Sequence, residues 1–132
     1  MTEPRDIRVL LVDDHPLVRT TLSEIVEDEH GLTVVGECAD GSEVVEATAR
    51  LRPDVVCMDL SMPTMNGVAA TEALRAARAE VRIVVFTAGV DARTVVAAAG
   101  ADALVPKSTR PDALLRCLRA VAEGARDCPY CL

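Results

Sequence analysis

The feature that most constrains the fold is an alternation of short apolar runs with longer amphipathic stretches. The runs are continuous and mostly rich in β-branched residues: 9–12 (VLLV), 33–36 (TVVG), 55–58 (VVCM), 83–86 (IVVF) and 103–105 (ALV). Strands with this pattern are buried on both faces, as in a parallel sheet covered by helices. The runs therefore predict buried parallel strands.

The stretches between these runs carry apolar residues at helical spacing. We expect helices at residues 16–26, 42–51, 68–77, 91–99 and 112–123. Pro16 and Pro111 suit helix starts, and Gly124 suits a helix stop. A strand–helix unit repeated in this way, with right-handed crossovers, predicts a doubly wound α/β fold. The order of elements alone leaves a Rossmann-like half and a flavodoxin-like sheet of order 2-1-3-4-5 both open.

Polar side chains that suggest a shared site follow four of the five predicted strands, whereas the second ends in the less informative Glu37-Cys38. Asp13 and Asp14 follow the first strand, Asp59 the third, Thr87 the fourth and Lys107 the fifth. The carboxyl ends of parallel strands form one rim, where ligands of such sheets bind. Three neighbouring carboxylates repel one another unless a cation joins them, and oxygen ligands suit Mg²⁺ or Mn²⁺. A carboxylate held there is a plausible nucleophile toward phosphorus, with Lys107 as a point charge for the phosphoryl group.

Composition narrows the class of protein. The 132 residues fit one domain, and the net charge of −7 argues against nucleic-acid binding by it. No apolar run approaches the roughly 18 residues of a membrane span, and the N-terminus lacks the apolar core of a signal peptide. The 5 cysteines are an odd set, so we expect a reduced, cytoplasmic chain. All basic residues but Lys107 are arginine, which suggests that an ammonium is required at that position.

Four motifs resemble the receiver domain of two-component response regulators, and most closely its NarL/FixJ branch. They are RVLLVDDHP, VCMDLSMPTMNG, VFTAG and GADALVPK, and the resemblance runs from about Arg8 to Gly124. It implies a flavodoxin-like (βα)5 fold with a five-stranded parallel sheet of order 2-1-3-4-5. We accordingly divide the chain into an N-terminal arm (1–6), a receiver domain (7–124) and a C-terminal tail (125–132) without an output domain.

The resemblance also assigns roles around the predicted acidic rim. It implies that Asp59 accepts a phosphoryl group from a histidine kinase. Asp13, Asp14, Asp59 and the backbone carbonyl of Ser61 would hold Mg²⁺, or alternatively Mn²⁺. Thr87 and Lys107 would contact the phosphoryl group, so we include both with Asp59 as catalytic residues.

Further positions shape the loops and the switch in this family. Pro63 and Gly67 would shape the loop after the third strand, while Ser61 and Gly89 would tune the phosphoryl lifetime. Thr87 would carry the switch together with the residue three positions before the lysine.

That second switch position departs from the family pattern. It is usually Tyr or Phe, but here it is Leu104. The stretch from Thr87 to Lys107 is also a residue or two shorter than usual, which predicts a truncated fourth helix or preceding loop. These departures affect the readout and leave the residues of the phosphorylation chemistry intact.

Two other features have simpler interpretations. The CPYC sequence at Cys128–Cys131 resembles a glutaredoxin-like redox motif, which begins a helix that follows a strand. Only Leu132 follows it here, so we expect a flexible tail. His15, beside the acid pair, we expect to be a polar residue of the first helical turn.

We therefore predict a receiver that switches a protein-interaction face when Asp59 is phosphorylated. It would catalyse only its own phosphorylation and dephosphorylation, and would act alone or within a NarL/FixJ-type transcriptional regulator. Its partners would be a histidine kinase or phosphotransfer protein, and a downstream protein or a second copy, with no nucleic acid or membrane. One alternative is an atypical, phosphorylation-independent interaction module. A phosphohydrolase ranks lower, because that class needs an acid where Ser61 stands.

Overall fold

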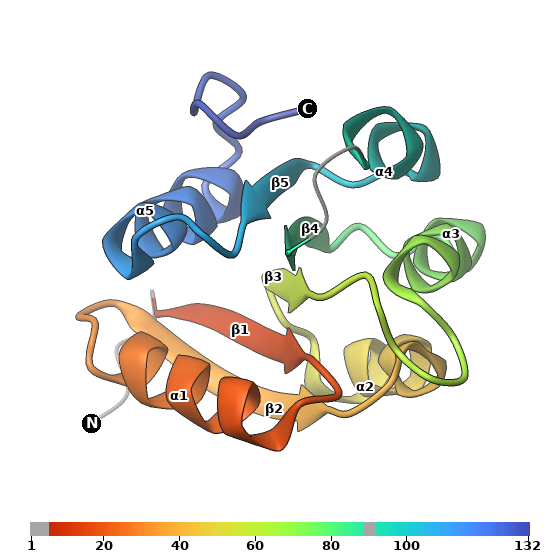
Figure 1. Ribbon diagram of the computed structural model, residues 1–132, viewed down its shortest axis with the longest axis horizontal. Coiled ribbons are helices and arrows are strands. Elements are labelled where there is room, and N and C mark those ends of the chain that lie inside the picture. Colours follow the sequence, from red (N-terminus) through yellow and green to blue (C-terminus); the bar gives the residue numbers. More distant parts are fainter. Residues whose placement is uncertain (1–5, 89–91) are drawn as a thin grey trace.

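The computed structural model describes residues 6–88 and 92–132 (Figure 1). Its sheet is parallel, with strand order β2-β1-β3-β4-β5. The strands are β1 (Ile7–Val12), β2 (Leu32–Cys38), β3 (Val55–Met58), β4 (Arg82–Thr87) and β5 (Ala103–Pro106). This order confirms the flavodoxin-like fold and removes the Rossmann-like alternative. The predicted N-terminal arm lies outside the described residues except for Asp6.

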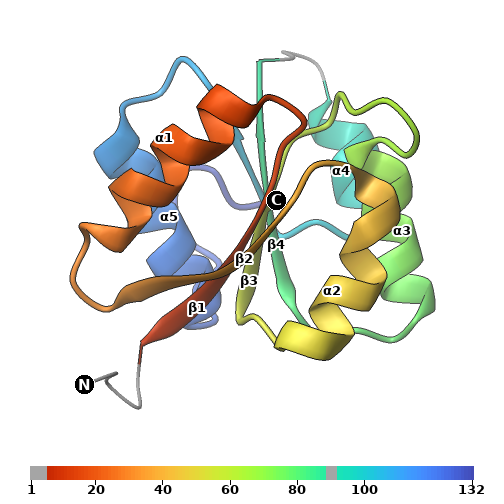
Figure 2. The same ribbon diagram turned by 90° about the horizontal axis from the view of Figure 1, so that it is seen from below.

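Helices cover both faces of the sheet, as Figure 2 shows: α1 and α5 pack on one face, and α2, α3 and α4 on the other. Their bounds are α1 (Pro16–Glu27), α2 (Val44–Leu51) after a short 3-10 turn at Gly41–Glu43, α3 (Gly67–Ala76), α4 (Arg93–Ala99) and α5 (Pro111–Ala122). Pro16 and Pro111 occupy the first helical positions, as predicted. Within residues 6–88 and 92–132, no helix has the length and apolar character needed to cross a bilayer.

Two apolar layers, one on each side of the sheet, form the core. Along β1, Val9 and Leu11 pack in the layer beneath α1 and α5, whereas Leu10 and Val12 pack in the layer beneath α2 and α3. All four residues of β3 are buried. The apolar runs in β1, β3, β4 and β5 therefore mark strands buried on both faces, whereas the run in β2, at an edge of the sheet, is only partly buried. A rigid sheet of this kind holds the residues after its strands in fixed relative positions.

The part of the fold around β5 differs from the rest in the length of its helix and in the pairing of its edge strand. Helix α4 has 7 residues and is shorter than the other four described α-helices, while the truncation relative to the family stays a prediction. The tail is not a loose extension: Cys131 forms an antiparallel bridge with Ala103 of β5. The prediction of a flexible tail is corrected accordingly, because β5 is an edge strand whose free backbone groups can pair with it.

Candidate functional site

The acidic residues meet because β1 and β3 are neighbours in the sheet. Val12 and Met58 are register partners at the ends of these strands, and the next residues are Asp13 and Asp59. The Asp59 backbone N–H donates to the Val12 carbonyl at 2.9 Å. Both side chains are almost fully buried, with exposed fractions of 2% for Asp13 and 5% for Asp59. The predicted convergence of these two carboxylates is confirmed.

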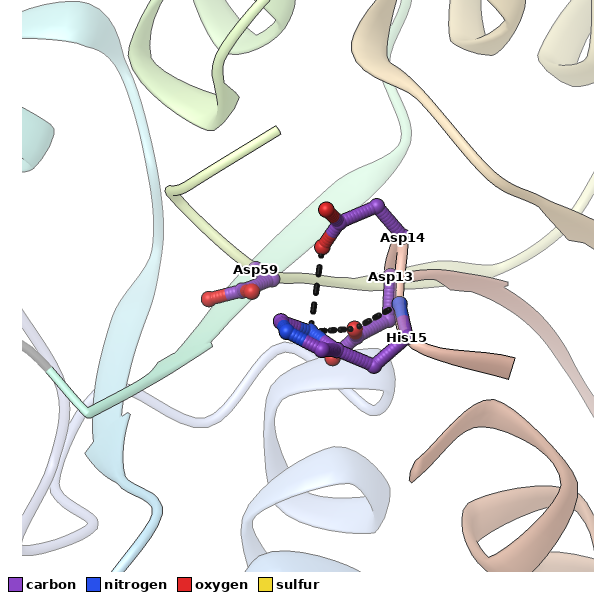
Figure 3. Close-up of side chains that lie close together, drawn as sticks. All are labelled: Asp13, Asp14, His15 and Asp59. Atoms are coloured by element: carbon purple, nitrogen blue, oxygen red, sulfur yellow. Dashed lines mark hydrogen bonds and ion pairs between the residues drawn. The ribbon is translucent and has the colours of Figure 1, made fainter. Parts of the chain in front are cut away.

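Asp14 and His15 complete the group of side chains drawn in Figure 3. Asp13, Asp14, His15 and Asp59 each offer a ligand atom within 4.8 Å of the others. The His15 backbone N–H donates to Asp13 Oδ1 at 2.9 Å, and the ring nitrogen Nδ1 lies 3.1 Å from the same oxygen. The sequence predicts a polar residue of the first helical turn beside the acid pair, and His15 lies there, exposed at the N-cap of α1. An aspartate that accepts the N–H two residues later is the signal that could have placed it in the site.

Lys107 enters the group from the end of β5. Its ammonium donates to Asp13 Oδ2 at 3.0 Å and lies 3.4 Å from Asp59 Oδ2. Burial acts to lower the pKa of Lys107, but the hydrogen bond to Asp13 and the charges of Asp59 and Asp13 raise it above its ordinary value. Lys107 is therefore a charged ammonium that balances two buried carboxylates.

Thr87 ends β4 on the same rim and is 3% exposed. The Lys107 backbone N–H donates to the Thr87 carbonyl at 2.8 Å, which fixes the start of the Lys107 segment next to Thr87. The five residues that sequence reasoning selected at the strand ends thus share one rim. A buried threonine and a lysine ammonium on the same rim can together bind an anionic group.

The loop after Asp59 is tied down by Asp40, which sequence reasoning missed. Asp40 accepts backbone N–H groups from Thr64 at 2.9 Å and Met65 at 3.2 Å, and from Ser42 at 2.9 Å. Hydrogen bonds from Ser42, chiefly, and then from Thr64 lower the pKa of Asp40 to about 2. This carboxylate therefore joins the β2–α2 loop to the loop that shapes the acidic rim.

Gly67 closes the same loop at the start of α3. Its N–H donates to the Leu60 carbonyl at 2.8 Å. A Cβ at this position would collide with the backbone carbonyl of Asp59. The prediction that Gly67 shapes the loop is consistent with this contact, since glycine alone permits so close an approach. The Leu60 N–H donates in turn to Asp59 Oδ1 at 2.8 Å, which orients the carboxylate.

The donor set fits a hard divalent cation. Asp14 Oδ1 is buried and has no hydrogen-bond partner among the described residues, although His15 Nδ1 lies 3.1 Å away. Buried carboxylate oxygens rarely remain without a partner, and Mg²⁺ takes carboxylate oxygens with water. Asp13, Asp14 and Asp59 would hold such an ion. Ser61 lies exposed two residues after Asp59, and the metal role of its carbonyl stays a prediction.

Comparison with known proteins decides the family. The sequence model of the response regulator receiver domain matches residues 9–119, most of the chain. The chain belongs to the response regulator receiver domain family. As relatives of this receiver, the nitrate/nitrite response regulator NarL of Escherichia coli is 36% identical over 126 residues, and the transcriptional regulatory protein LiaR of Bacillus subtilis is 38% identical over 120 residues.

The receiver covers only part of these relatives. The NarL match takes in 94% of this chain and 58% of NarL, and the LiaR match takes in 89% and 57%. Among solved structures, a LuxR-family response regulator from Aurantimonas has a TM-score of 0.86 at 35% identity, over 92% of this chain and 89% of that one. The receiver domain of a putative response regulator NarL from Mycobacterium tuberculosis has a TM-score of 0.87 at 27% identity, over 92% and 99%. The resemblance to the NarL branch is confirmed.

The positions where this receiver departs from its family lie on β5 and after β4. Leu104 is 8% exposed and packs in the layer beneath α3 and α4, so an aliphatic side chain fills the usual aromatic position. Gly89, predicted to tune the phosphoryl lifetime, lies outside the described residues. The tuning role of Ser61 stays a prediction, as does the role of Pro63 in shaping the loop.

Proposed function

We propose that this receiver accepts a phosphoryl group on Asp59 from a histidine kinase or phosphotransfer protein, in a two-component signalling pathway. One observation carries the proposal: Lys107 lies within 3.4 Å of buried Asp13 and Asp59, while a buried oxygen of Asp14, 3.1 Å from His15 Nδ1, has no hydrogen-bond partner in the described part of the chain. A phosphoryl group carries negative charge during its transfer. A lysine ammonium and a cation site beside the accepting carboxylate can stabilise that charge.

The two oxygens of Asp59 have different surroundings. Oδ1 accepts the Leu60 N–H, whereas Oδ2 faces the Lys107 ammonium. Oδ2 is therefore the proposed nucleophile. It forms a bond to phosphorus as the bond from phosphorus to the donor's histidine nitrogen breaks, and that nitrogen keeps the electron pair.

The remaining residues of the rim position the group and neutralise its charge. Asp13, Asp14 and Asp59 would hold Mg²⁺, which would supply positive charge for the phosphoryl group. Lys107 moves from its carboxylate partners to a phosphoryl oxygen, and the Thr87 hydroxyl donates to another. The burial of Asp59 limits access of water, which favours slow hydrolysis. The receiver would thus catalyse only its own phosphorylation and dephosphorylation.

Phosphorylation would then change a protein-interaction face through Thr87 and Leu104, on the adjacent strands β4 and β5. The downstream partner would be another protein or a second copy of this chain. The receiver would act alone or as part of a NarL-type transcriptional regulator, in the cytoplasm. Neither nucleic acid nor a membrane is a proposed partner of this domain.

The direct test is labelling with a small phosphodonor such as acetyl phosphate in the presence of Mg²⁺. We expect the wild-type receiver to gain one phosphoryl group and Asp59→Asn to gain none. Asp28→Asn is the matched control, because Asp28 is an exposed aspartate at the end of α1. Equal labelling of the wild-type receiver and Asp59→Asn would remove Asp59 from its role.

A second candidate function is an interaction module that does not respond to phosphorylation. The aliphatic Leu104 at the usual aromatic position favours it. Beryllofluoride with Mg²⁺ separates the two, since it mimics a phosphoryl group on aspartate. Spectral changes of amides between Thr87 and Lys107 support switching, whereas changes confined to Asp59 support the module.

A further inference from the structure

The C-terminal tail forms a sixth, short strand-like segment on the β5 edge. The Leu104 N–H donates to the Tyr130 carbonyl at 3.0 Å, and the Leu132 N–H donates to the Asp102 carbonyl at 3.0 Å. Arg93 of α4 donates to the Cys131 carbonyl at 2.7 Å. Figure 1 shows the tail leaving α5 and passing beside β5. This segment therefore lies along the edge of the sheet that β5 forms.

The thiols of Cys128 and Cys131 lie at the two ends of the turn that places the tail against β5. The Cys131 N–H donates to the Cys128 carbonyl at 3.1 Å, and the two Sγ atoms are 2.6 Å apart. Both residues are partly exposed, so a small oxidant can reach them. A third thiol, of buried Cys117 on α5, lies 3.9 Å from Cys128 Sγ.

A pocket of about 230 Å³ opens beside these sulfurs, between α5 and the tail. Cys117, Cys128 and Tyr130 line it together with Arg116. The pocket brings a guanidinium close to the thiols, which suits an anionic thiol reagent such as a glutathione species.

We propose that Cys128 and Cys131 are a redox modification site, which forms a reversible disulfide that fastens the tail to β5. The site is separate from the acidic rim and does not depend on phosphorylation. It is also distinct from a metal site: within residues 6–88 and 92–132, the one group of three or more mutually close metal-ligand side chains is the acidic one.

The oxidant is a small-molecule disulfide, and the chemistry is thiol–disulfide exchange. The thiolate of one cysteine attacks a sulfur of the oxidant and releases one small thiolate. The second cysteine thiolate then attacks the mixed disulfide and releases the other. Two cysteine thiols are oxidised to one disulfide, one disulfide is reduced to two thiols, and the two cysteine protons pass to the released thiolates.

Cys117 is the less suitable partner for Cys128. Burial raises the pKa of both Cys117 and Cys131, so the two are separated by geometry: Cys117 is buried with its Sγ 3.9 Å from Cys128 Sγ, whereas Cys131 is partly exposed with its Sγ at 2.6 Å. The place of Cys117 on α5 also separates it from the turn that holds Cys128 and Cys131. The disulfide within the turn is therefore the one that forms.

The disulfide acts on the backbone pairing that the turn supports. Tyr130 lies between the two cysteines, and its carbonyl accepts the Leu104 N–H. The disulfide reduces the conformational freedom of the tail when it is detached from the sheet. The paired state therefore becomes more stable relative to the detached state. Leu104 also occupies the position of the usual aromatic switch residue. Oxidation therefore changes the mobility of the β5 edge at that position.

The experiment oxidises the 132-residue chain with glutathione disulfide, digests it with trypsin without reduction and measures peptide masses. Cleavage after Arg116, Arg119 and Arg126 places Cys117 in peptide 117–119 and both tail cysteines in peptide 127–132. We expect peptide 127–132 to lose two hydrogens and to regain them with dithiothreitol. Cys117→Ala should still form the disulfide, and Cys131→Ser should not.

Hydrogen exchange reads the structural effect. The Leu104 amide should exchange several-fold more slowly in the oxidised chain, whereas the Asp102 amide, which donates to Ile83 of β4, should not change. A cross-linked pair of peptides 117–119 and 127–132 would overturn the proposed pairing. Unmodified thiols, glutathione adducts alone, or equal Leu104 exchange in both states would overturn the proposal as well.

Discussion

The acidic rim and the β5 edge lie on one sheet but differ in how closely they follow the family. At the rim, Asp13, Asp14, Asp59, Thr87 and Lys107 all stand where the receiver pattern places them. At the edge, Leu104 replaces an aromatic ring, α4 is short and the tail covers the free strand. The proposed chemistry and the proposed readout of this receiver therefore rest on separate structural requirements.

This difference has a physical basis. The rim depends on charges at fixed positions, since moving one carboxylate or ammonium would leave the others unbalanced in a buried site. The edge depends on packing and backbone pairing, which tolerate other side chains of suitable volume. A sequence can thus change its edge and keep its rim, and variants in the two regions should have separable effects.

The largest expected effect is on the rate of labelling. It appears when the removal of one cation at the acidic rim is compared with the removal of one cation at the β5 edge. Lys107→Ala should slow labelling by acetyl phosphate about 100- to 1000-fold, as the loss of one charge-stabilising donor does in other sites. Arg93→Ala removes a cation that binds the tail and should leave the labelling rate unchanged. Rapid-quench measurement of both rates tests the separation, and similar rates for the two variants would break it.

The next effect concerns the metal. Asp14→Asn removes the carboxylate whose buried oxygen lacks a hydrogen-bond partner among residues 6–88 and 92–132, so we expect Mg²⁺ affinity to fall about tenfold or more. Calorimetric titration with MgCl₂ measures the change, with Asp28→Asn as the control. An unchanged affinity would show that Asp14 is not a ligand.

Much of the rim could be predicted because each of its members lies at the end of a strand or within two residues after it. The continuous runs around Val9 and Val55 identify strands, and parallel strands bring their carboxyl ends together whatever the loops do. Strand order could not be derived from periodicity and came from the resemblance. The limits of elements were less certain: β2 runs from Leu32 to Cys38, beyond the predicted 33–36.

The features that were missed depend on contacts between distant or weakly patterned segments. Asp40 holds backbone groups 24 and 25 residues away, at Thr64 and Met65, and no local pattern indicates them. The tail pairs with β5 only because strand order leaves β5 at the edge. Sequence reasoning therefore finds residues fixed by the sheet and misses those fixed by loop-to-loop or edge contacts.

A moderate effect on stability should follow from restoring an aromatic residue at the edge. Leu104→Tyr adds volume and a hydroxyl to a layer in which Leu104 is already buried, which should cost about 1–3 kcal/mol of unfolding free energy. Urea unfolding measures this cost, and Leu104→Met is the volume-matched control. Labelling of Asp59 should stay at the wild-type rate, and a large fall would show that rim and edge are coupled.

The smallest expected effect concerns the loop that shapes the acidic rim. It is the pH dependence of stability that follows from the ionisation of Asp40. Its pKa is lowered from 3.8 to about 2 in the folded chain, so the ionised carboxylate stabilises the fold above about pH 4. That stabilisation is lost as the pH falls through 2, because the carboxyl is then protonated in both states. Asp40→Asn should therefore be less stable than wild type at pH 7, with the gap narrowing between pH 4 and pH 2. Urea midpoints across this range measure the gap, and a gap that stays constant would mean that the ionised form of Asp40 does not hold the loop after Asp59.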